Sequence, residues 1–454
     1  MYKNIQTIND VDILVIGAGS AGCIAAIAAA YGKKYKVLLV ERYGFPGGTS
    51  TQMLDTFYGF FTPGEVPKKI VGGLPDKVVN RLNELGEMFL RPNTYGAGTG
   101  VNYNPERLKN VWDELLLQSG ASLLLHTTLI DVNTKSNGNY ECIFWNKSGF
   151  YKAEPKRVID ASGDADFCHH AGFAYEIAGE LEPAQSMTTT FRMANVDLDV
   201  YEKAGGKKLL AKIMANTSHP LPRKEGSAHA MNIEKCISTV AVRVAGLSAL
   251  KVEELTAAEI EGRRQAFVFE KFFQQEVPGY SQSKIIGLSN QVGVRETRRV
   301  YGEHRLTKEA CMAATVNDDA ILLCGAPIED HRAGKNGDTE TVWQYIPQSG
   351  VYGVPYGTIV PIKSETVWVI GRCFSATHDA HASCRSMGQT MAMGHAAGLA
   401  AVQSLEKDEA ADNVNVQFLR STLHEQGAVL QAPTEKAFTG KEEWTLNKTA
   451  HALF

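Results

Sequence analysis

The apolar positions at the start of the chain follow the pattern of a strand, a helix and a second strand. Residues 11–16 form a short apolar run rich in β-branched side chains, which is typical of a buried strand. Glycines interrupt the run at residues 17–22, and the Ala-rich stretch at 20–31 predicts a helix. A second apolar run at 36–41 ends in an acid. The pattern therefore predicts a βαβ unit of about 30 residues.

The same alternation returns in two distant parts of the chain. A short apolar strand at 157–160 leads into a turn at 161–164, and another at 367–371 precedes an Ala- and Gly-rich helix at 388–402. Strands that alternate with helices favour a doubly wound parallel sheet, so we expect an α/β fold assembled from separate parts of the chain. Further expected elements are helices at 74–85, 104–119 (with Asn104 as N-cap and Pro105 at the first helical position), 256–275 and 413–426, a strand at 122–126, and a hairpin at 140–144 and 149–153.

The first turn has the spacing of a dinucleotide-binding site. Gly17, Gly19 and Gly22 form G-x-G-x-x-G between a strand and a helix, which is the context that this motif requires. Gly17 permits the tight turn, Gly19 lets a pyrophosphate approach the backbone, and Gly22 lets the helix pack on the strand. The N-terminus of the helix offers free N–H groups to the anion. Glu41, at the end of the second strand, can accept hydrogen bonds from both hydroxyls of a ribose.

Three further motifs separate FAD from NAD as the dinucleotide. They are the Gly47-Gly48-Thr49 turn after Glu41-Arg42, the turn Ala161-Ser162-Gly163-Asp164, and Gly371-Arg372 followed by a helix that begins near Gly388 and Gln389. In this order they resemble the flavin contacts of FAD enzymes with the glutathione-reductase-type fold. Residues 293–307 and 371–378 in turn resemble the family called FAD-dependent oxidoreductase, a relative of the succinate dehydrogenase and fumarate reductase flavoproteins.

The resemblance implies FAD as cofactor and a discontinuous Rossmann-like FAD-binding domain beside a mixed α+β substrate (cap) domain. The FAD-binding domain is expected at residues 1–50, 105–180 and 351–410, the cap domain at 51–104 and 181–350, and a C-terminal extension at 411–454. The implied cofactor contacts are Gly17, Gly19, Ser20, Ala21, Gly22, Glu41, Arg42, Gly47, Gly48, Thr49, Leu129, Ala161, Ser162, Gly163, Asp164, Gly371, Arg372, Gly388 and Gln389.

Two departures from related flavoproteins change the interpretation. Many of them end the last strand with Gly-Asp, whereas this chain has Gly371-Arg372, whose charge would favour the pyrophosphate or an anionic reduced flavin. The chain also lacks the paired redox cysteines and the second G-x-G-x-x-G of disulfide reductases. A disulfide reductase with its own nicotinamide domain is therefore not expected.

Flavin chemistry requires a group that handles the proton accompanying the hydride, and cations that hold developing negative charge. His378 and His381 lie between the last strand and the following helix, where side chains should lie beside the flavin. Arg385, Arg295 and Arg298 are candidates to bind an anionic substrate group. The alternatives are that the histidines only form structural hydrogen bonds and that Arg295 and Arg298 belong to an ion-pair network between the domains. Arg385 could instead contact the pyrimidine edge of the flavin or form a salt bridge at a helix start.

Other residue clusters have simpler interpretations. Asp164, Asp166, Cys168, His169 and His170 resemble a metal site by residue type, but they fit a flavin-contacting turn and a helix start, and no metal is expected. The eight cysteines have no metal-ligand spacing and are expected to be reduced. The aromatic residues Phe57, Tyr58, Phe60 and Phe61 fit core packing better than the wall of a substrate pocket.

Composition limits the class of protein. The chain has 46 Lys and Arg against 50 Asp and Glu, a net charge of −4, which disfavours nucleic acid as a partner. Neither a membrane span nor a signal peptide is apparent, so a cytoplasmic location is expected. The expected partners are a small-molecule substrate and an electron acceptor that the sequence does not identify. A homo-oligomer is compatible with the sequence.

The sequence thus predicts a FAD-dependent oxidoreductase, a dehydrogenase, oxidase or reductase that transfers a hydride between a small polar organic substrate and flavin N5. Two alternatives stay open. One is a flavin-binding electron-transfer subunit without its own substrate, which the large unit at 181–350 disfavours. The other is a flavin-dependent RNA-modifying enzyme, which the acidic balance disfavours.

Overall fold

A five-stranded parallel sheet lies at the centre of the computed structural model, which describes residues 4–333 and 339–433. The strand order is β22-β11-β2-β3-β7, and every pairing is parallel. The strands are β2 (Ile13–Ile16), β3 (Val37–Val40), β7 (Ser122–Leu124), β11 (Arg157–Asp160) and β22 (Val367–Val369). The predicted assembly of one sheet from distant parts of the chain is confirmed.

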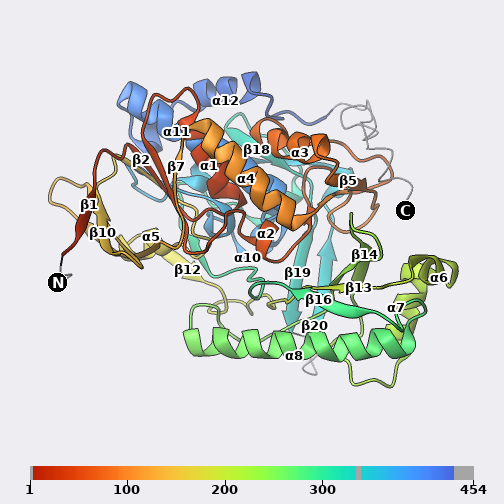
Figure 1. The fold of residues 1–454 in the computed structure, drawn as a ribbon. Helices are drawn as coiled ribbons and strands as arrows, with labels where there is room; N and C mark the ends of the chain where they lie inside the picture. Colours follow the sequence, from red (N-terminus) through yellow and green to blue (C-terminus); the bar gives the residue numbers. More distant parts are fainter. Residues whose placement is uncertain (1–3, 334–338, 434–454) are drawn as a thin grey trace.

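Helices α1 (Ser20–Ala30) and α11 (Met387–Lys407) pack against each other over one face of this sheet (Figure 1). Their backbones approach closely because the contact positions have no side chain. A Cβ atom at Gly394 would lie 2.2 Å from the Ala21 carbonyl oxygen, and one at Gly398 would lie 2.5 Å from that of Ala25. The close contact joins the first βαβ unit to the C-terminal helix.

Three further helices complete this layer: α3 (Leu74–Glu84), α4 (Pro105–Ser119) and α12 (Val416–Glu425). The predicted N-cap of α4 is confirmed, because the Asn104 side chain accepts a hydrogen bond from the Glu106 N–H group. The core beneath these helices contains the fully buried Trp112 and Trp368.

The other side of the parallel sheet packs against a four-stranded sheet in the order β1-β10-β9-β8. Its strands are β1 (Gln6–Ile8), β8 (Thr128–Thr134), β9 (Tyr140–Asn146) and β10 (Gly149–Ala153). β9 and β10 are antiparallel, which confirms the predicted hairpin. Leu129, Phe144 and Phe167 of the short helix α5 (Asp166–His170) share one buried cluster here.

A second unit contains a four-stranded antiparallel sheet, which we call the cap sheet. Its order is β14-β15-β13-β16, and its strands are β13 (Phe191–Ala194), β14 (Ser227–Ala230), β15 (Ile237–Val240) and β16 (Lys284–Leu288). The long helix α8 (Val252–Glu276) runs beneath this sheet, along the bottom of Figure 1. Phe191 and Met193 pack with Phe269 and Phe273 of α8. The helix predicted at 256–275 is therefore confirmed, and it begins one turn earlier.

The aromatic segment after the second turn belongs to the core. The helix α2 (Thr49–Gln52) leads into a small antiparallel sheet of β4 (Thr56–Phe57), β6 (Gly100–Tyr103) and β5 (Met88–Arg91). Phe57, Phe60 and Phe61 are fully buried in the same cluster as Trp112. Tyr58 is partly exposed and accepts a short hydrogen bond from Arg91.

The remaining elements are short. They are the strand pairs β12 (Tyr175–Ile177) with β17 (Arg298–Val300), β18 (Ala320–Cys324) with β21 (Tyr352–Pro355) and β19 (Ile328–Ala333) with β20 (Thr339–Gln344), and the helices α6 (Leu198–Lys203), α7 (Gly206–Asn216), α9 (Lys308–Met312) and α10 (His378–Cys384). The division into domains stays a prediction, and residues 434–454 of the expected C-terminal extension lie outside the described residues.

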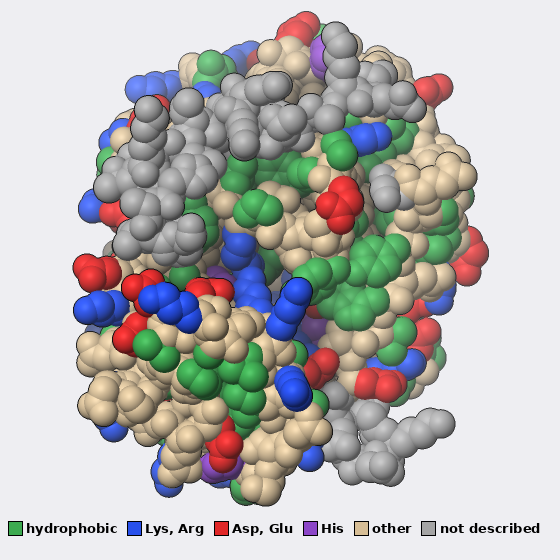
Figure 2. Space-filling model, turned by 90° about the vertical axis from the view of Figure 1, so that its right-hand side faces the viewer, with side chains coloured by type: hydrophobic (Ala, Val, Ile, Leu, Met, Phe, Trp, Pro, Cys, Tyr) green, Lys and Arg blue, Asp and Glu red, His purple; other side chains and the backbone are tan. Residues whose placement is uncertain are grey.

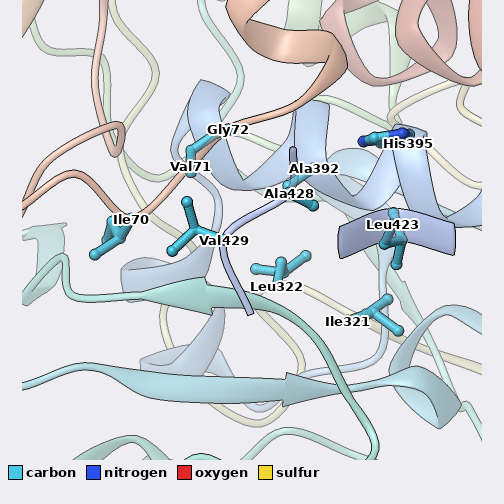
Figure 3. A pocket seen from close by; sticks show the side chains of 10 residues that line it. All are labelled: Ile70, Val71, Gly72, Ile321, Leu322, Ala392, His395, Leu423, Ala428 and Val429. Atoms are coloured by element: carbon cyan, nitrogen blue, oxygen red, sulfur yellow. The ribbon is translucent and has the colours of Figure 1, made fainter. Parts of the chain in front are cut away.

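A small, mostly apolar cavity lies between α11, α12, β18 and the segment before α3 (Figure 3). Its lining is Ile70, Val71, Gly72, Ile321, Leu322, Ala392, His395, Leu423, Ala428 and Val429. None of the predicted site residues is among them. No helix in the described ranges has both the length and the apolar character needed to cross a bilayer.

Candidate functional site

The three glycines of the first turn have different surroundings. A Cβ atom at Gly17, where φ is +92°, would lie 2.6 Å from the Ala161 carbonyl oxygen, and one at Gly22 would lie 1.9 Å from that of Gly17. At Gly19 a Cβ atom would have no neighbour within 4 Å. No side chain caps α1, and no acid lies in its first turn. Gly17 and Gly22 are therefore needed for packing, whereas Gly19 borders open space above an uncapped helix N-terminus.

The predicted ribose acid lies beside this turn. Glu41 is buried at the end of β3, and its carboxylate accepts hydrogen bonds from the N–H groups of Ala18 (2.7 Å) and Tyr43 (2.9 Å). Burial raises the pKa of Glu41, and these two hydrogen bonds oppose that shift. The carboxylate is thereby fixed in position by backbone donors.

The Gly47-Gly48 turn lies directly against the first turn. Gly47 donates its N–H group to the Ala18 carbonyl (2.7 Å), and Ser20 and Ser50 are hydrogen-bonded through their hydroxyls (3.0 Å). A Cβ atom at Gly48, where φ is +54°, would lie 2.8 Å from the Gly19 Cα atom. Thr49 is the first residue of α2, and its side chain is exposed. Arg42 is exposed, with its guanidinium 5.0 Å from the centre of the Tyr43 ring.

The turn at 161–164 and the last strand meet the first turn from the other side. Gly371 has a φ of +77°, and a Cβ atom at this position would lie 3.4 Å from the Cβ atom of Ala21. Arg372 donates from Nη2 to Asp164 (2.7 Å) and from Nη1 to the Val294 carbonyl (2.7 Å). Burial raises the pKa of Asp164, but the charges of Arg372 and Arg42 outweigh it and hold the pKa below its ordinary value. The positive residue after Gly371 thus forms an ion pair between two predicted motifs.

The start of α11 lies against the segment after α2. Gly388 donates its N–H group to the Tyr58 carbonyl (2.9 Å), and Gln389 donates from Nε2 to the Gly59 carbonyl (2.8 Å). Among the described residues, Oε1 of Gln389 is buried and has no hydrogen-bond partner. Leu129 is buried in the core with Val40 and Phe144, two residues after Thr127, whose N–H group donates to the Glu41 carbonyl (2.9 Å).

These residues fit FAD. The open space at Gly19, the uncapped start of α1, the fixed Glu41 carboxylate and the unpartnered Gln389 oxygen are the features that a pyrophosphate, a ribose and a polar ring edge require. The turns at 17–22, 47–48 and 161–164 would hold the cofactor together with Glu41 and the start of α11. No group of three or more His, Cys, Asp or Glu side chains in the described part of the chain is arranged for a metal ion.

His378, at the start of α10, lies between two carboxylates. Its Nδ1 atom is 3.1 Å from Glu296 and its Nε2 atom is 3.3 Å from Asp330. Both ring nitrogens therefore face carboxylates, which favours the protonated ring. Burial alone would lower the pKa of His378, but the two carboxylates outweigh it and raise the pKa to about 10.

His381 is held in the opposite state. Its Nε2 atom donates to the Arg372 carbonyl (2.6 Å), and its Nδ1 atom is buried without a partner among the described residues. Burial lowers its pKa to about 3, so the ring is neutral. The structure places both predicted histidines next to the flavin motifs. The pKa values of both lie far from neutral pH, so neither ring changes its protonation state there.

The three predicted arginines separate into two places. Arg298 donates to the Asp164 carbonyl (2.7 Å) and lies 3.4 Å from Asp166. Arg295 and Arg385 lie together near residues 185–188, because Arg295 donates to Thr188 (3.0 Å) and Arg385 donates to Gln185 (3.1 Å).

Two groups of side chains were missed by the sequence analysis. Arg243 joins Arg295 at Thr188, donating to its hydroxyl at 2.6 Å. His229 of β14 and Asp55, just after α2, form a buried pair with Nε2 and Oδ1 3.0 Å apart. The available signal was weak: Asp55 follows the flavin-contacting turn by a few residues, and no local pattern marks His229 or Arg243.

Replacing Gly19 with Ala tests the cofactor cradle without disturbing the fold. Gly19→Ala should leave the melting temperature of the FAD-free protein unchanged, because the new methyl group meets no neighbour within 4 Å. It should weaken FAD binding, because that methyl group occupies the space above the helix N-terminus. Gly22→Ala is the contrast and should lower the melting temperature itself. Normal FAD binding by Gly19→Ala would contradict this assignment.

The ion pairs of His378 predict a characteristic dependence of stability on pH. The lowered pKa of Glu296, about 2 against 4.5, gives stability above pH 4.5 that is lost as pH falls towards 2. The raised pKa of His378 gives stability below pH 6.5 that is lost as pH rises towards about 10. The free energy of unfolding should therefore be highest between pH 4.5 and 6.5.

His378→Gln should be less stable near pH 6 and should show a weaker decline in stability above pH 6.5. The control is His424→Gln, which changes an exposed histidine of α12. Denaturant unfolding across this pH range measures the effect. An equal alkaline decline in the native protein and in His378→Gln would show that the ion pairs do not set it.

The solved structures to which this chain is similar are distant from it in sequence. Comparison with curated proteins gives no match. A geranylgeranyl bacteriochlorophyll reductase-like protein from Thermoplasma acidophilum is 15% identical, with a TM-score of 0.48 over 94% of this chain and 85% of that chain. A p-nitrophenol 4-monooxygenase from Pseudomonas putida is 10% identical, with a TM-score of 0.46 over 99% of this chain and 95% of that chain. These scores are too low to support a conclusion about substrate or reaction.

The family comparison is decisive. The model of the family described as FAD dependent oxidoreductase matches residues 12–423, which include every predicted cofactor residue from Gly17 to Gln389. The matched range also contains the three turns around Gly19, both predicted histidines and all three predicted arginines. The chain therefore belongs to the FAD dependent oxidoreductase family and is an enzyme of that class with FAD as its cofactor.

Proposed function

We propose that the protein transfers a hydride between a small polar organic substrate and N5 of FAD, with the substrate held against the polar face of the cap sheet. The observation that carries this proposal is the buried pair of His229 and Asp55, which joins that face to the segment directly after the Gly47-Gly48 turn. A hydroxy compound, an amine or an activated carbon–carbon bond suits this chemistry. The order of the motifs also favours kinship with glutathione-reductase-type flavoproteins and fumarate reductase.

The cap sheet has one apolar and one polar face. Phe191 and Met193 of β13 lie in the core against α8, so Arg192 between them points to the other face. Arg192 lies opposite Ser238 of β15, and Ser238 lies opposite His229 of β14. These three residues form a polar row across the sheet.

The polar face meets the segment that follows the flavin-contacting turn. Thr190, on the same face as Arg192, donates its hydroxyl to the Met53 carbonyl (2.5 Å), and His229 contacts Asp55. Figure 2 looks onto the side of the molecule that carries β5, β14 and α7, where basic side chains gather in a hollow. Arg91 of β5 and Lys207 of α7 contribute positive charge that acts on His229. A substrate bound there would lie between the cap sheet and the turn that holds the flavin.

Bound FAD supplies N5 as the atom that accepts or donates the hydride. The chain supplies the group that handles the accompanying proton. The Nε2 atom of His229 donates to Asp55, and its Nδ1 atom is buried without a partner among the described residues. A histidine oriented by a carboxylate on one nitrogen and free on the other is the arrangement of a general base.

The protonation states of the pair agree with this role. Burial lowers the pKa of His229, and the charges of Arg91 and Lys207 add to that effect against the opposing charge of Asp55. Burial raises the pKa of Asp55, but His229, Arg91 and Arg192 outweigh it and hold the pKa below its ordinary value. His229 is therefore neutral at neutral pH and Asp55 is ionised. In this proposal His378 and His381 position Glu296 and Arg372 instead of exchanging protons.

Reconstitution with 5-deazaFAD tests hydride transfer directly, because that analogue carries a hydride but is a poor one-electron carrier. Candidate hydroxy acids, amines and saturated acids are screened anaerobically for loss of flavin absorbance. A substrate that reduces the FAD protein should also reduce the 5-deazaFAD protein. Reduction of the FAD protein alone would overturn hydride transfer and support the electron-transfer alternative.

His229→Gln should slow flavin reduction by the substrate by about 10²- to 10⁴-fold while FAD stays bound. In the native protein the rate should fall only at acid pH, because burial lowers the pKa of His229 below its ordinary value and protonation of the ring removes the base. This acid limb should be absent in His229→Gln. The measurement is stopped-flow reduction across pH, with His424→Gln as control. A variant that keeps both the rate and the acid limb would remove His229 from the reaction.

A further inference from the structure

Three arginines from distant segments meet beside the cap sheet, and we call them the arginine cluster. Arg243 follows β15, Arg295 precedes β17, and Arg385 follows α10. Arg243 is buried, whereas Arg295 and Arg385 are partly exposed. Their hydrogen bonds converge on residues 185–188, so the guanidinium groups share one small region.

The hydrogen bonds of the cluster go to neutral acceptors. Thr188 accepts from both Arg243 (2.6 Å) and Arg295 (3.0 Å) through one hydroxyl oxygen. The remaining partners are the carbonyls of Val242 (3.3 Å to Arg243), Ser186 (to Arg295) and Glu329 (3.3 Å to Arg385), the Gln185 side chain (3.1 Å to Arg385) and His331 Nδ1 (3.2 Å to Arg243). Within residues 4–333 and 339–433, none of the three forms an ion pair with a carboxylate.

Several donors of the cluster are left over. Nη1 makes both hydrogen bonds of Arg295, so its Nε and Nη2 groups have no partner in the described part of the protein. Arg385 uses only Nη2, and its Nε atom is buried without a partner among the described residues. The guanidinium groups of the partly exposed Arg295 and Arg385 therefore keep unused N–H groups. Planar guanidinium donors of this kind recognise an oxyanion.

The charges of the cluster repel one another. Burial lowers the pKa of Arg243 to about 9 and that of Arg295 below its ordinary value, and the neighbouring arginines add to both shifts. His331 does not compensate, because burial and these arginines lower its pKa and keep it neutral. The carboxylate of Glu329 lies 2.8 Å from Nε2 of His331. The charge of Glu329 opposes the lowering of the pKa values of all three arginines, but among the described residues no carboxylate forms an ion pair with the cluster.

The cluster borders the proposed substrate site. Thr188 lies two residues before Thr190 on the same chain segment, and its N–H group donates to the Gly293 carbonyl (3.2 Å). A Cβ atom at Gly293 would touch the sulfur of Met53, in the segment that carries Asp55. The pyrophosphate of FAD has its own place at the 17–22 turn, which none of the cluster's hydrogen bonds reaches.

We infer that Arg243, Arg295 and Arg385 form an anion subsite that binds an oxyanionic group of the substrate, a carboxylate or a phosphate. The inference rests on the proposed function, because it names the substrate class of the same site. The bound anion supplies the negative charge that the cluster lacks and occupies the free N–H groups of Arg295 and Arg385. Arg243 fixes Thr188 and His331 by hydrogen bonds and so supports the other two arginines.

The test is thermal unfolding of the FAD-loaded protein with succinate, phosphate, chloride at equal ionic strength, and neutral succinamide. FAD-loaded protein is used so that the pyrophosphate site is filled. Succinate or phosphate should raise the melting temperature more than chloride or succinamide does. The larger of the two shifts tells whether the group is a carboxylate or a phosphate. No anion-specific shift above chloride would overturn the inference.

Arg295→Gln and Arg385→Gln should weaken anion binding by roughly 10- to 100-fold, measured from the anion concentration that gives half the shift. Arg263→Gln, which removes an exposed arginine of α8 paired with Glu259, should keep native anion binding. Without anion, both cluster variants should melt at or above the native temperature, because a repelling charge is removed. Variants that melt lower and keep the anion shift would show a structural role and overturn the inference.

This readout needs no turnover. A protein that binds the anion but fails the 5-deazaFAD test would overturn the proposed hydride transfer and leave the anion subsite standing. Conversely, if Arg385→Gln changes only the reduction potential of the flavin and keeps the anion shift, Arg385 serves the flavin and the subsite is wrong.

Discussion

The structure depends on close contact between backbones at one edge of the parallel sheet. Gly17, Gly22 and Gly48 lie where any side chain would overlap main-chain atoms of Ala161, Gly17 and Gly19. Gly394 does the same against Ala21 from the C-terminal helix. These contacts let three turns from distant parts of the chain meet around Gly19, which alone among the glycines of the first turn borders open space. A cofactor site of this kind needs both properties: turns packed without side chains and one unfilled gap between them.

Charge then connects these turns to the second unit. Arg372 joins Asp164 to the Val294 carbonyl, and Thr297 also donates to Asp164 (2.9 Å). Further along, Arg299 links Glu296 to Glu176, and Glu296 holds His378. Buried ion pairs of this kind are costly to break because one charge is left without a partner. The network therefore fixes how the residues around 293–305 lie against the flavin turns.

The network differs in its charge pairing from the two groups that we propose face the substrate. Within the network each charge has a partner of opposite sign. Among the described residues, Nδ1 of His229 has no hydrogen-bond partner, and the arginine cluster forms no ion pair with a carboxylate, although the charge of Glu329 acts on it. Unsatisfied buried groups lower the stability of a fold, and they are tolerated where a ligand completes them.

The sequence by itself determined the parallel sheet, the order of its motifs and the family of flavoenzymes, because these depend on short-range signals. Glycine spacing, apolar periodicity and helix caps act over a few residues, and each predicted element was found within a few residues of its expected place. Tertiary structure decided the chemistry of the side chains. His378 became a fixed cation through Glu296, 82 residues away, and His229 gained Asp55, 174 residues away. Protonation depends on burial and on neighbouring charges, and neither is written in the local pattern of a chain; only folding brings those neighbours together.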